Sequence, residues 1–430
     1  MIPESVIPKD GRSSMAQTQA GRILLVWPEY PPGIGGMQVH GVEFARYLHA
    51  QGIPFTVVAA LPRNVAEQAE CAAFDSANGF GARRILPRGG ALEDTLTLLS
   101  REATNGEATN GPVRAVFASQ LALAPAFASL RAHGVPIVCR SAGNDVLRPW
   151  IGPCDLTYKV VKKLPYREQR ARLAQNRDWI LKAAQHCDLV LCNSEWTRER
   201  LSHLSCRREV VLGGVDIDRF RPLPEDERTA LRAAFGWQNA EVLFIAARHT
   251  LKKGIDTAME AVARLAPSRP GLLLVIAGYG TETDNLRALS EELEIASRVR
   301  FVGSLPHTLM PRYMAAADVA LAPSRDVYDP RRFAIDYETM GRMVCESAAC
   351  GTPTVATTVG GVPEVVRHNE TGVLVPPNDP EALADATVTL LADRDKACAM
   401  ARRARAWAET HLSFARVSEE TLHFLFGGGV

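Results

Sequence analysis

The chain alternates short apolar runs with segments of helical periodicity. Residues 23–27 (Ile-Leu-Leu-Val-Trp) form a continuous apolar run that ends before Pro28, which is typical of a strand buried on both faces of a parallel sheet. A Pro- and Gly-rich turn follows, and then a helical pattern over residues 37–50. Further strands of this first series are predicted at residues 55–60, 113–117, 137–139, 189–192 and 210–212. Strands separated by helices predict right-handed crossovers and a doubly wound α/β sheet.

A second series of the same kind follows the first. Its strands are predicted at residues 242–246, 272–277, 300–302, 319–322, 354–356 and 373–375. Two complete series predict two domains, at residues 22–213 and 214–410, which join where Gly213-Gly214 gives way to a Pro-containing segment. We expect residues 1–21 to be a flexible leader and residues 411–430 to be a C-terminal helix.

Composition narrows the class of protein. With 47% hydrophobic and 23% charged residues, the chain of 430 residues is typical of a soluble globular protein. Its 49 Lys plus Arg against 48 Asp plus Glu give a net charge of +1, so no overall field draws it to nucleic acid. The nine cysteines are scattered and odd in number, which disfavours a disulfide framework and favours a reducing compartment. No run of 18 apolar residues occurs in the sequence, and we expect a cytoplasmic protein.

One stretch is more basic than its surroundings. Residues 158–185 are rich in Lys, Arg and Gln and predict one or two amphipathic helices. The pattern fits a solvated helix face, and it also fits a patch that contacts the acceptor or a membrane surface. In the second case the protein would lie peripherally at the inner face of the membrane.

Glycines follow the first predicted strand at positions 33, 35 and 36. They let the backbone approach a ligand, and the helix that follows would offer its N-terminal amides to a phosphate, although a tight turn needs the same glycines. The segment does not match Gly-x-Gly-x-x-Gly, because Gln38 occupies the position of the third glycine. Gly278-Tyr279-Gly280 fails in the same way at Thr283. A nicotinamide-dependent enzyme is therefore disfavoured.

Two permanent cations, Arg248 and Lys253, follow the first strand of the second series. Open α/β sheets bind ligands just beyond the carboxyl ends of their strands, where an Arg fork and a Lys point charge suit a diphosphate. A solvated turn would also hold basic residues. Glu338 and Glu346 then stand in a Glu-x7-Glu spacing, and the second opens a helix that stops at Gly351. Their carboxylates are suited to accept hydrogen bonds from sugar hydroxyls, although two solvated glutamates would fit the spacing alone.

Taken together, these motifs resemble a known family. From about residue 23 to residue 391 and in the right order, the chain looks like a retaining glycosyltransferase of family 4 with the GT-B fold, in which two Rossmann-like domains face each other across a cleft. The motifs that carry the resemblance are the N-terminal Gly-Gly turn, Asn193-Ser194-Glu195, Gly213-Gly214-Val215-Asp216 before Phe220-x-Pro222, Arg248-x4-Lys253-Gly254, Phe301-Val-Gly303, Pro323-Ser324-Arg325, Glu338-x7-Glu346, Cys350-Gly-Thr-Pro353 and Gly360-Gly-Val-Pro-Glu364.

The resemblance implies a role for each matching position. Arg248 and Lys253 would hold the donor diphosphate, Glu338 would contact donor-sugar hydroxyls, and these three would be the catalytic residues. Glu346 would accept the ribose hydroxyls. The remaining donor contacts would come from backbone groups at Gly35, Gly36, Val302, Met340, Gly341, Arg342, Met343 and Val344. The family is typically metal-independent, so no cofactor is expected besides the nucleotide diphosphate sugar, either a UDP- or a GDP-sugar, that serves as donor substrate. The C-terminal helix would pack back on the N-terminal, acceptor domain.

The sequence also departs from the family. Ala142 stands where many relatives carry a histidine that contacts the donor sugar, so Arg140, Asn144 or Asp145 would have to compensate, or the donor sugar would differ. We place Asn144 and Asp145 on the acceptor and sugar side. The acceptor itself, whether a small molecule, a lipid or a glycan, is not encoded in a recognisable motif.

Three other interpretations fit parts of the sequence. Asp216-Ile217-Asp218 resembles a metal-binding Asp-x-Asp motif, but it coincides with the family's Gly-Val-Asp turn, so no metal site is predicted. A sugar-nucleotide 2-epimerase of the same fold is disfavoured by the Glu-x7-Glu region. A binding protein without turnover stays open because of Ala142.

Overall fold

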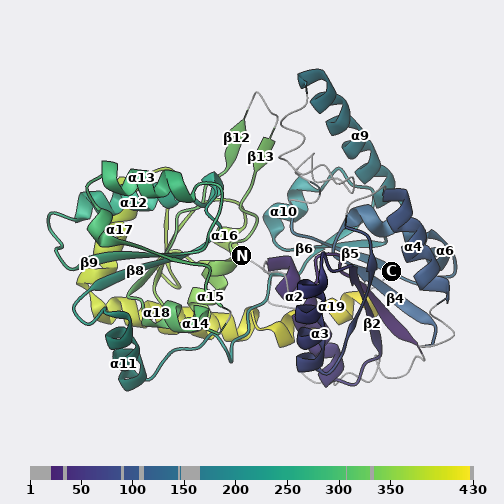
Figure 1. The fold of residues 1–430 in the computed structure, drawn as a ribbon, viewed down its shortest axis with the longest axis horizontal. Helices are drawn as coiled ribbons and strands as arrows, with labels where there is room; N and C mark the ends of the chain where they lie inside the picture. Colours follow the sequence, from purple (N-terminus) through teal and green to yellow (C-terminus); the bar gives the residue numbers. More distant parts are fainter. Residues whose placement is uncertain are drawn as a thin grey trace.

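Two parallel β-sheets, each flanked by helices, form the two domains of the computed structural model (Figure 1). The structure describes residues 21–31, 36–88, 92–105, 111–143, 146, 165–306, 308–329 and 334–426. The predicted α/β architecture of two doubly wound sheets is confirmed.

The N-terminal domain holds a seven-stranded sheet in the order β3-β2-β1-β4-β5-β6-β7. Its strands are β1 (Arg22–Val26), β2 (Phe55–Ala60), β3 (Ala82–Leu86), β4 (Val113–Ala118), β5 (Ile137–Ser141), β6 (Leu189–Cys192) and β7 (Arg207–Val210). Its helices are α2 (Gly36–Ala50), α3 (Val65–Asn78), α4 (Leu92–Asn105), η1 (Leu121–Phe127), α6 (Ala128–Ala132), α9 (Tyr166–Ala184) and α10 (Glu195–Arg200). The apolar run in β1 serves both faces: Leu24 and Val26 enter one core cluster, and Ile23 and Leu25 enter the other.

The C-terminal domain holds a six-stranded sheet in the order β10-β9-β8-β11-β14-β15. Its strands are β8 (Glu241–Ala246), β9 (Leu272–Ala277), β10 (Val299–Gly303), β11 (Val319–Ala322), β14 (Thr354–Thr357) and β15 (Val373–Val375), and a separate antiparallel hairpin pairs β12 (Val327–Asp329) with β13 (Ala334–Asp336). Its helices are α11 (Glu225–Phe235), η2 (Leu251–Lys253), α12 (Ile255–Leu265), α13 (Thr283–Glu292), η3 (Ala296–Arg298), α14 (Met310–Ala316), α15 (Arg342–Cys350), α16 (Val362–Val365), α17 (Pro380–Ala392) and α18 (Arg394–His411). In both sheets the strand order reverses beside the first strand, which is where doubly wound sheets bind ligands.

Two edge strands depart from the sequence prediction. β3 was not predicted, because its sequence Ala-Arg-Arg-Ile-Leu lacks an apolar run, and the Arg84 side chain pairs with Asp75 of α3 at 3.0 Å. β7 was placed at residues 210–212, but it occupies Arg207–Val210, a segment with three charged residues. An edge strand has only one neighbour and is less buried than a central one, so it does not need a continuous apolar sequence.

The chain passes between the domains twice, and the two passages lie side by side. The backbone N–H of Val215 donates to the carbonyl of Leu412 at 2.7 Å, and that of Phe414 donates to the carbonyl of Val215 at 3.2 Å. The last helix, α19 (Phe414–Phe426), then packs against α2 of the N-terminal domain. Figure 1 shows these C-terminal helices in yellow, running from one domain to the other.

Helix α9 lies within the basic stretch predicted at residues 158–185, of which residues 158–164 are outside the described part. Figure 1 shows α9 and the β12–β13 hairpin projecting from the two domains on the same side of the molecule. Among the described helices, none combines the length and the apolar character that crossing a membrane requires.

Candidate functional site

The carboxyl edges of the two sheets meet at the domain boundary. Asn193 and Ser194, which follow β6, both bond to Thr339 of the other domain: the Asn193 amide donates to the Thr339 hydroxyl at 3.0 Å, and the Ser194 hydroxyl donates to the Thr339 carbonyl at 2.8 Å. The Glu364 carboxylate accepts the backbone N–H groups of Glu195 and Trp196 at 2.6 and 2.8 Å. We call these four bonds the interdomain contact.

The Gly360-Gly361 pair makes this contact sterically possible. Gly360 has φ +53°, and a Cβ atom there would lie 1.5 Å from the carbonyl oxygen of Glu338. A Cβ atom on Gly361 would lie 2.5 Å from the Cβ of Ser194. Both positions therefore exclude larger residues, because the loop presses on backbone and on the opposite domain. The sequence marked Gly360 to Glu364 as a motif but gave Thr339 and Glu364 no role, since their partners lie more than 140 residues away.

An ion pair between half-buried Lys253 and buried Glu338 lies at the carboxyl edge of the C-terminal domain's sheet. Lys253, the last residue of η2, donates through Nζ to Glu338 Oε2, and the Ser324 hydroxyl donates to the same oxygen at 3.0 Å. Glu338 is 6% exposed. Burial alone would raise the pKa of its carboxyl, but the charges of Lys253 and Lys252, with the hydrogen bonds from Lys253 and Ser324, lower that pKa to about 2. Glu338 is therefore ionised at every physiological pH.

Lys252, the neighbour of Lys253, bonds to different partners. It is buried, and its Nζ lies 3.0 Å from Asp336 Oδ1 and donates to the carbonyl of Tyr337 at 2.9 Å. These bonds tie the turn after β8 to the segment that carries Glu338. The sequence gives no sign of this role, because nothing in a Lys-Lys pair distinguishes a ligand-binding lysine from one that fixes a loop.

A pocket beside this ion pair collects five of the predicted donor residues. It opens at the carboxyl ends of β8 and β11, where the strand order reverses. Its lining includes Lys253, Glu338, Gly341, Met343 and Val344. The last three belong to the N-terminus of α15, where the first amides of a helix have no intrahelical acceptor and the helix dipole is positive. Lys253 and this helix end together make a site suited to a phosphate group.

Arg342 connects Glu346 with the N-terminal domain. Its Nε donates to Glu346 Oε1 at 2.7 Å, one helical turn away, and its Nη1 donates to the carbonyl of Gly36 at 3.3 Å. Gly36 begins α2, so the N-termini of α2 and α15 approach each other across the boundary. This brings together two of the glycine- and glutamate-containing motifs that the sequence placed in the donor site.

Other predicted donor residues lie apart from the pocket. Arg248 is exposed, and within the described residues its side chain makes no hydrogen bond or ion pair. Val302, in β10, is half-buried and packs against the hydrophobic core. The Met340 side chain is buried at the first passage between the domains, where its sulfur accepts the N–H of Gly213 at 3.0 Å. Gly35, Asn144 and Asp145 lie outside the described residues.

His249 braces the loops after β8 and β9. It is fully buried, and its Nδ1 lies 2.9 Å from the Thr283 hydroxyl. That hydroxyl donates its proton to the carbonyl of Gly280 at 2.9 Å, so the hydrogen bond assigns the Nδ1 proton to His249. Burial, and then the charge of Arg287, lower the pKa of His249, so the ring is neutral. His249 thereby fixes the loop from which Arg248 projects.

The Asp216-Ile217-Asp218 segment caps a turn. Asp216 Oδ1 accepts the backbone N–H groups of Asp218 and Arg219 at 3.2 and 3.0 Å, and its other oxygen pairs with the Arg219 side chain at 3.1 Å. Within the described ranges, no group of three or more His, Cys, Asp or Glu side chains is arranged to hold a metal ion.

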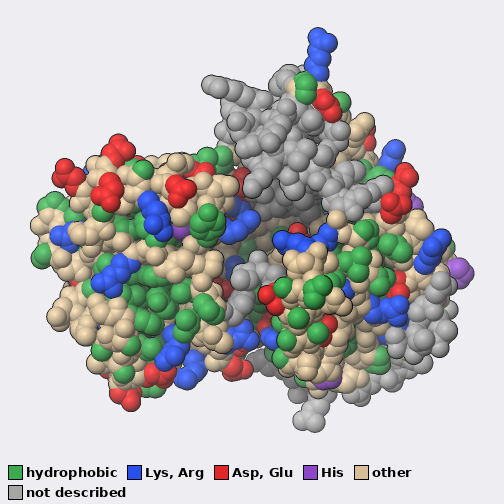
Figure 2. All heavy atoms as spheres, in the orientation of Figure 1, with side chains coloured by type: hydrophobic (Ala, Val, Ile, Leu, Met, Phe, Trp, Pro, Cys, Tyr) green, Lys and Arg blue, Asp and Glu red, His purple; other side chains and the backbone are tan. Residues whose placement is uncertain are grey.

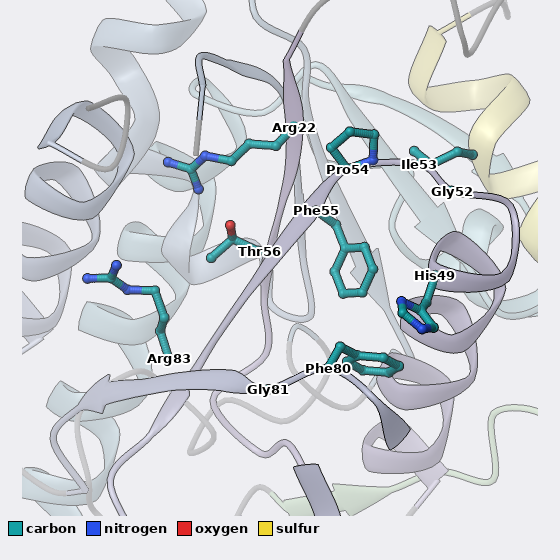
Figure 3. A pocket seen from close by; sticks show the side chains of 10 residues that line it. All are labelled: Arg22, His49, Gly52, Ile53, Pro54, Phe55, Thr56, Phe80, Gly81 and Arg83. Atoms are coloured by element: carbon teal, nitrogen blue, oxygen red, sulfur yellow. The ribbon is translucent and has the colours of Figure 1, made fainter. Parts of the chain in front are cut away.

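A cavity of about 580 Å³ lies at the other edge of the N-terminal sheet. It surrounds the amino ends of β1, β2 and β3, and Figure 3 shows the rings of His49, Phe55 and Phe80 on one side of it with Arg22 and Arg83 on the other. Because parallel strands share one carboxyl edge, this cavity is remote from the ion pair at the domain boundary. In the space-filling view of Figure 2, the surface is hollowed between the two domains, and Lys and Arg side chains gather on both rims of the hollow.

Comparisons with known proteins agree with this geometry. A family model described as "Glycosyltransferase Family 4" matches residues 34–219, and one described as "Glycosyl transferases group 1" matches residues 227–407. A GDP-mannose-dependent alpha-(1-6)-phosphatidylinositol monomannoside mannosyltransferase of Mycobacterium tuberculosis is 33% identical over 56% of this chain, a match that spans 62% of that relative's length.

Two other similarities cover nearly the whole chain. A GDP-mannose-dependent monoacylated alpha-(1-6)-phosphatidylinositol monomannoside mannosyltransferase of Corynebacterium glutamicum is 27% identical over 94% of this chain and 97% of its own length. The crystal structure of Anabaena HepE in complex with UDP superposes with a TM-score of 0.71 at 19% identity, covering 94% of this chain and 99% of that one. At that identity the superposition supports the fold.

Proposed function

Because the chain belongs to glycosyltransferase family 4 and has the GT-B fold, we propose that it transfers a sugar from a nucleotide diphosphate sugar to an acceptor hydroxyl, with retention at the anomeric carbon. The observation that carries the proposal is the pocket that Lys253 and Glu338 line together with the N-terminus of α15. A cation and a helix N-terminus suit a diphosphate, and an ionised carboxylate beside them suits the hydroxyls of the attached sugar.

In this proposal the C-terminal domain (214–410) binds the donor. Lys253, the α15 amides and the exposed Arg248 hold the diphosphate, and Glu338 accepts hydrogen bonds from the sugar. Glu346 accepts the ribose hydroxyls, and Arg342, already paired with it at 2.7 Å, fixes its rotamer. GDP-mannose is the first donor to test, because the mannosyltransferase relatives use it by name.

Catalysis then depends on positioning and on charge. The departing diphosphate gains negative charge, and Lys253, Arg248 and the α15 helix N-terminus are fixed where that charge develops. These groups offset part of the charge that a metal ion would otherwise offset, so we propose a metal-independent reaction. The N-terminal domain (22–213) shapes the acceptor site, and the relatives' phosphatidylinositol mannosides favour a lipid or polyol acceptor, which the protein would meet at the cytoplasmic face of a membrane.

The test is the release of nucleoside diphosphate from GDP-mannose, UDP-glucose and ADP-glucose, each with EDTA present. Release of free nucleoside diphosphate from one donor, undiminished by EDTA, supports a metal-independent transferase. Interconversion of UDP-sugars without release would instead identify an epimerase, and tight binding without either would identify a binding protein. Retention is read from the anomeric proton of the product by nuclear magnetic resonance.

A further inference from the structure

The interdomain contact places three side chains from both domains beside Glu338. Its bonds hold the N-terminus of α10 against Thr339, which follows Tyr337 and Glu338. Helix α10 carries Trp196 in its first turn and Arg200 at its end. The Trp196 and Tyr337 rings meet edge to face with centroids 5.1 Å apart. The Arg200 guanidinium lies over both, 4.2 Å from the Trp196 ring and 5.2 Å from the Tyr337 ring. We call Trp196, Arg200 and Tyr337 the boundary cluster.

Arg200 differs from the neighbouring cations in its partners. Arg198 pairs with Glu195, Lys253 with Glu338, and Arg342 with Glu346. Among the described residues, no carboxylate lies within ion-pair distance of Arg200, although the side chain is exposed. Its position is set by the two rings, which attract a cation without neutralising it. The boundary cluster therefore presents a pre-positioned positive charge to the solvent.

The field of Arg200 reaches the donor site. Asp326, which precedes the β12–β13 hairpin, accepts a hydrogen bond from the backbone of Glu338. Burial raises the pKa of the Asp326 carboxyl, the charge of Glu338 raises it further, and Arg200 and Lys252 oppose the rise. The charges of Arg200 and Glu338 therefore both act on Asp326, and Arg200 lies over the ring of Tyr337, the residue before Glu338.

We propose that the boundary cluster is an acceptor subsite in which Arg200 binds a phosphate group of the acceptor. A planar guanidinium forms paired hydrogen bonds with phosphate oxygens, and its exposed edge is free for them while its face rests on the rings. The phosphate belongs to a phosphorylated polyol or sugar, either soluble or as a lipid headgroup. This inference rests on the proposed glycosyltransferase function and adds the chemical class of the acceptor.

The test compares Arg200→Gln with the matched control Arg198→Gln, which removes a charge from the same helix. Calorimetry on the full chain with saturating GDP measures binding of myo-inositol 1-phosphate and of unphosphorylated myo-inositol. Co-sedimentation with phosphatidylcholine vesicles, with and without phosphatidylinositol, measures binding of the protein to a phosphate that is carried by a lipid. We expect the wild type and Arg198→Gln to bind one of the two phosphate forms, and Arg200→Gln to bind it about 10-fold more weakly with unchanged GDP affinity. Arg200→Lys keeps the charge but lacks the paired N–H donors of the guanidinium, so its affinity for the phosphate should lie between those of the wild type and Arg200→Gln.

Several results would overturn the proposal. Equal phosphate binding by the wild type and Arg200→Gln would do so, as would a wild type that binds GDP but neither phosphate form. Weaker GDP binding by Arg200→Gln would assign the cation to the donor diphosphate instead. A wild type that neither binds GDP nor cleaves any nucleotide sugar would contradict the proposed function itself, which the GDP titration separates from failure of the subsite alone.

Discussion

Removing Lys253 should destabilise the fold because it leaves the Glu338 carboxylate buried without its main counter-charge. The pKa of Glu338 is lowered from 4.5 to about 2, which corresponds to roughly 3 kcal/mol in favour of the ionised form. Breaking a buried ion pair by removing one partner costs about 3–5 kcal/mol. Lys252 still acts on Glu338 when Lys253 is absent. We therefore expect Lys253→Met to lower the free energy of unfolding by about 3 kcal/mol, near the low end of that range.

The double variant Lys253→Met/Glu338→Gln separates this effect from lost packing. It carries neither charge, so it should recover most of the unfolding free energy that Lys253→Met loses, although its glutamine must still be hydrogen-bonded. Urea unfolding followed by circular dichroism at pH 7 measures all three proteins. Lys396→Met, which removes an exposed lysine of α18, is the control and should stay within about 0.5 kcal/mol of the wild type.

The pH dependence gives a second check with a definite sign. The folded-state pKa of Glu338 lies below its value of 4.5 in the unfolded chain, so its contribution is complete above pH 4.5 and is lost as the pH falls toward 2. In Lys253→Met the carboxyl takes up a proton more readily. The difference in stability between wild type and variant should therefore narrow below about pH 4.5. If Lys253→Met were as stable as the wild type at pH 7, the ion pair would not stabilise the fold. If Lys253→Met/Glu338→Gln were no more stable than Lys253→Met, the loss would not come from the unpaired Glu338 charge.

Three further changes probe the donor site and the interdomain contact. Glu346→Ala should weaken use of the nucleotide-sugar donor by about 10-fold or more, measured as kcat/KM, because a charged hydrogen bond to the ribose is lost; unchanged kinetics would remove Glu346 from the site. Glu364→Ala leaves two backbone donors without their acceptor and should lower the free energy of unfolding by about 1–3 kcal/mol, whereas exposed Glu370→Ala should not, and equal urea midpoints for the two would contradict the contact. Gly360→Ala forces a Cβ atom against the Glu338 carbonyl and should abolish release of nucleoside diphosphate, so normal turnover would show that the loop can move aside.

The sequence predicted the strands that carry a short apolar run. Each central strand, such as β1 or β8, must be apolar on both faces, so a short apolar run identifies it. The edge strands β3 and β7 have fewer neighbours and hold charged residues, and their sequences therefore look like loops. The edge strands β10 and β15 of the other sheet were predicted because they keep short apolar runs, so the local apolar sequence decided which strands could be recognised.

The sequence predicted which residues belong to the site, but not which of them contact each other. The Glu-x7-Glu spacing and the basic turn after β8 pointed to Glu338 and Lys253 separately, and their pairing depends on β8 and β11 being neighbours in the sheet. Glu364 escaped assignment for a related reason: its partners are backbone amides of the other domain, which carry no residue identity. Contacts made by backbone groups over long sequence distances leave no pattern that a single sequence can reveal.

The position of α19 has a consequence for how the chain folds during synthesis. Val417, Leu422 and Leu425 complete the core cluster that includes Ile23 and Leu25 of β1, yet they follow the last strand of that sheet by roughly 200 residues, which takes a ribosome roughly 10–40 s at ~5–20 residues per second. Throughout that time one apolar face of the N-terminal sheet lacks its final helix. The first domain to emerge is thus the last to be completed, and a chaperone that shields apolar surface would find its target there.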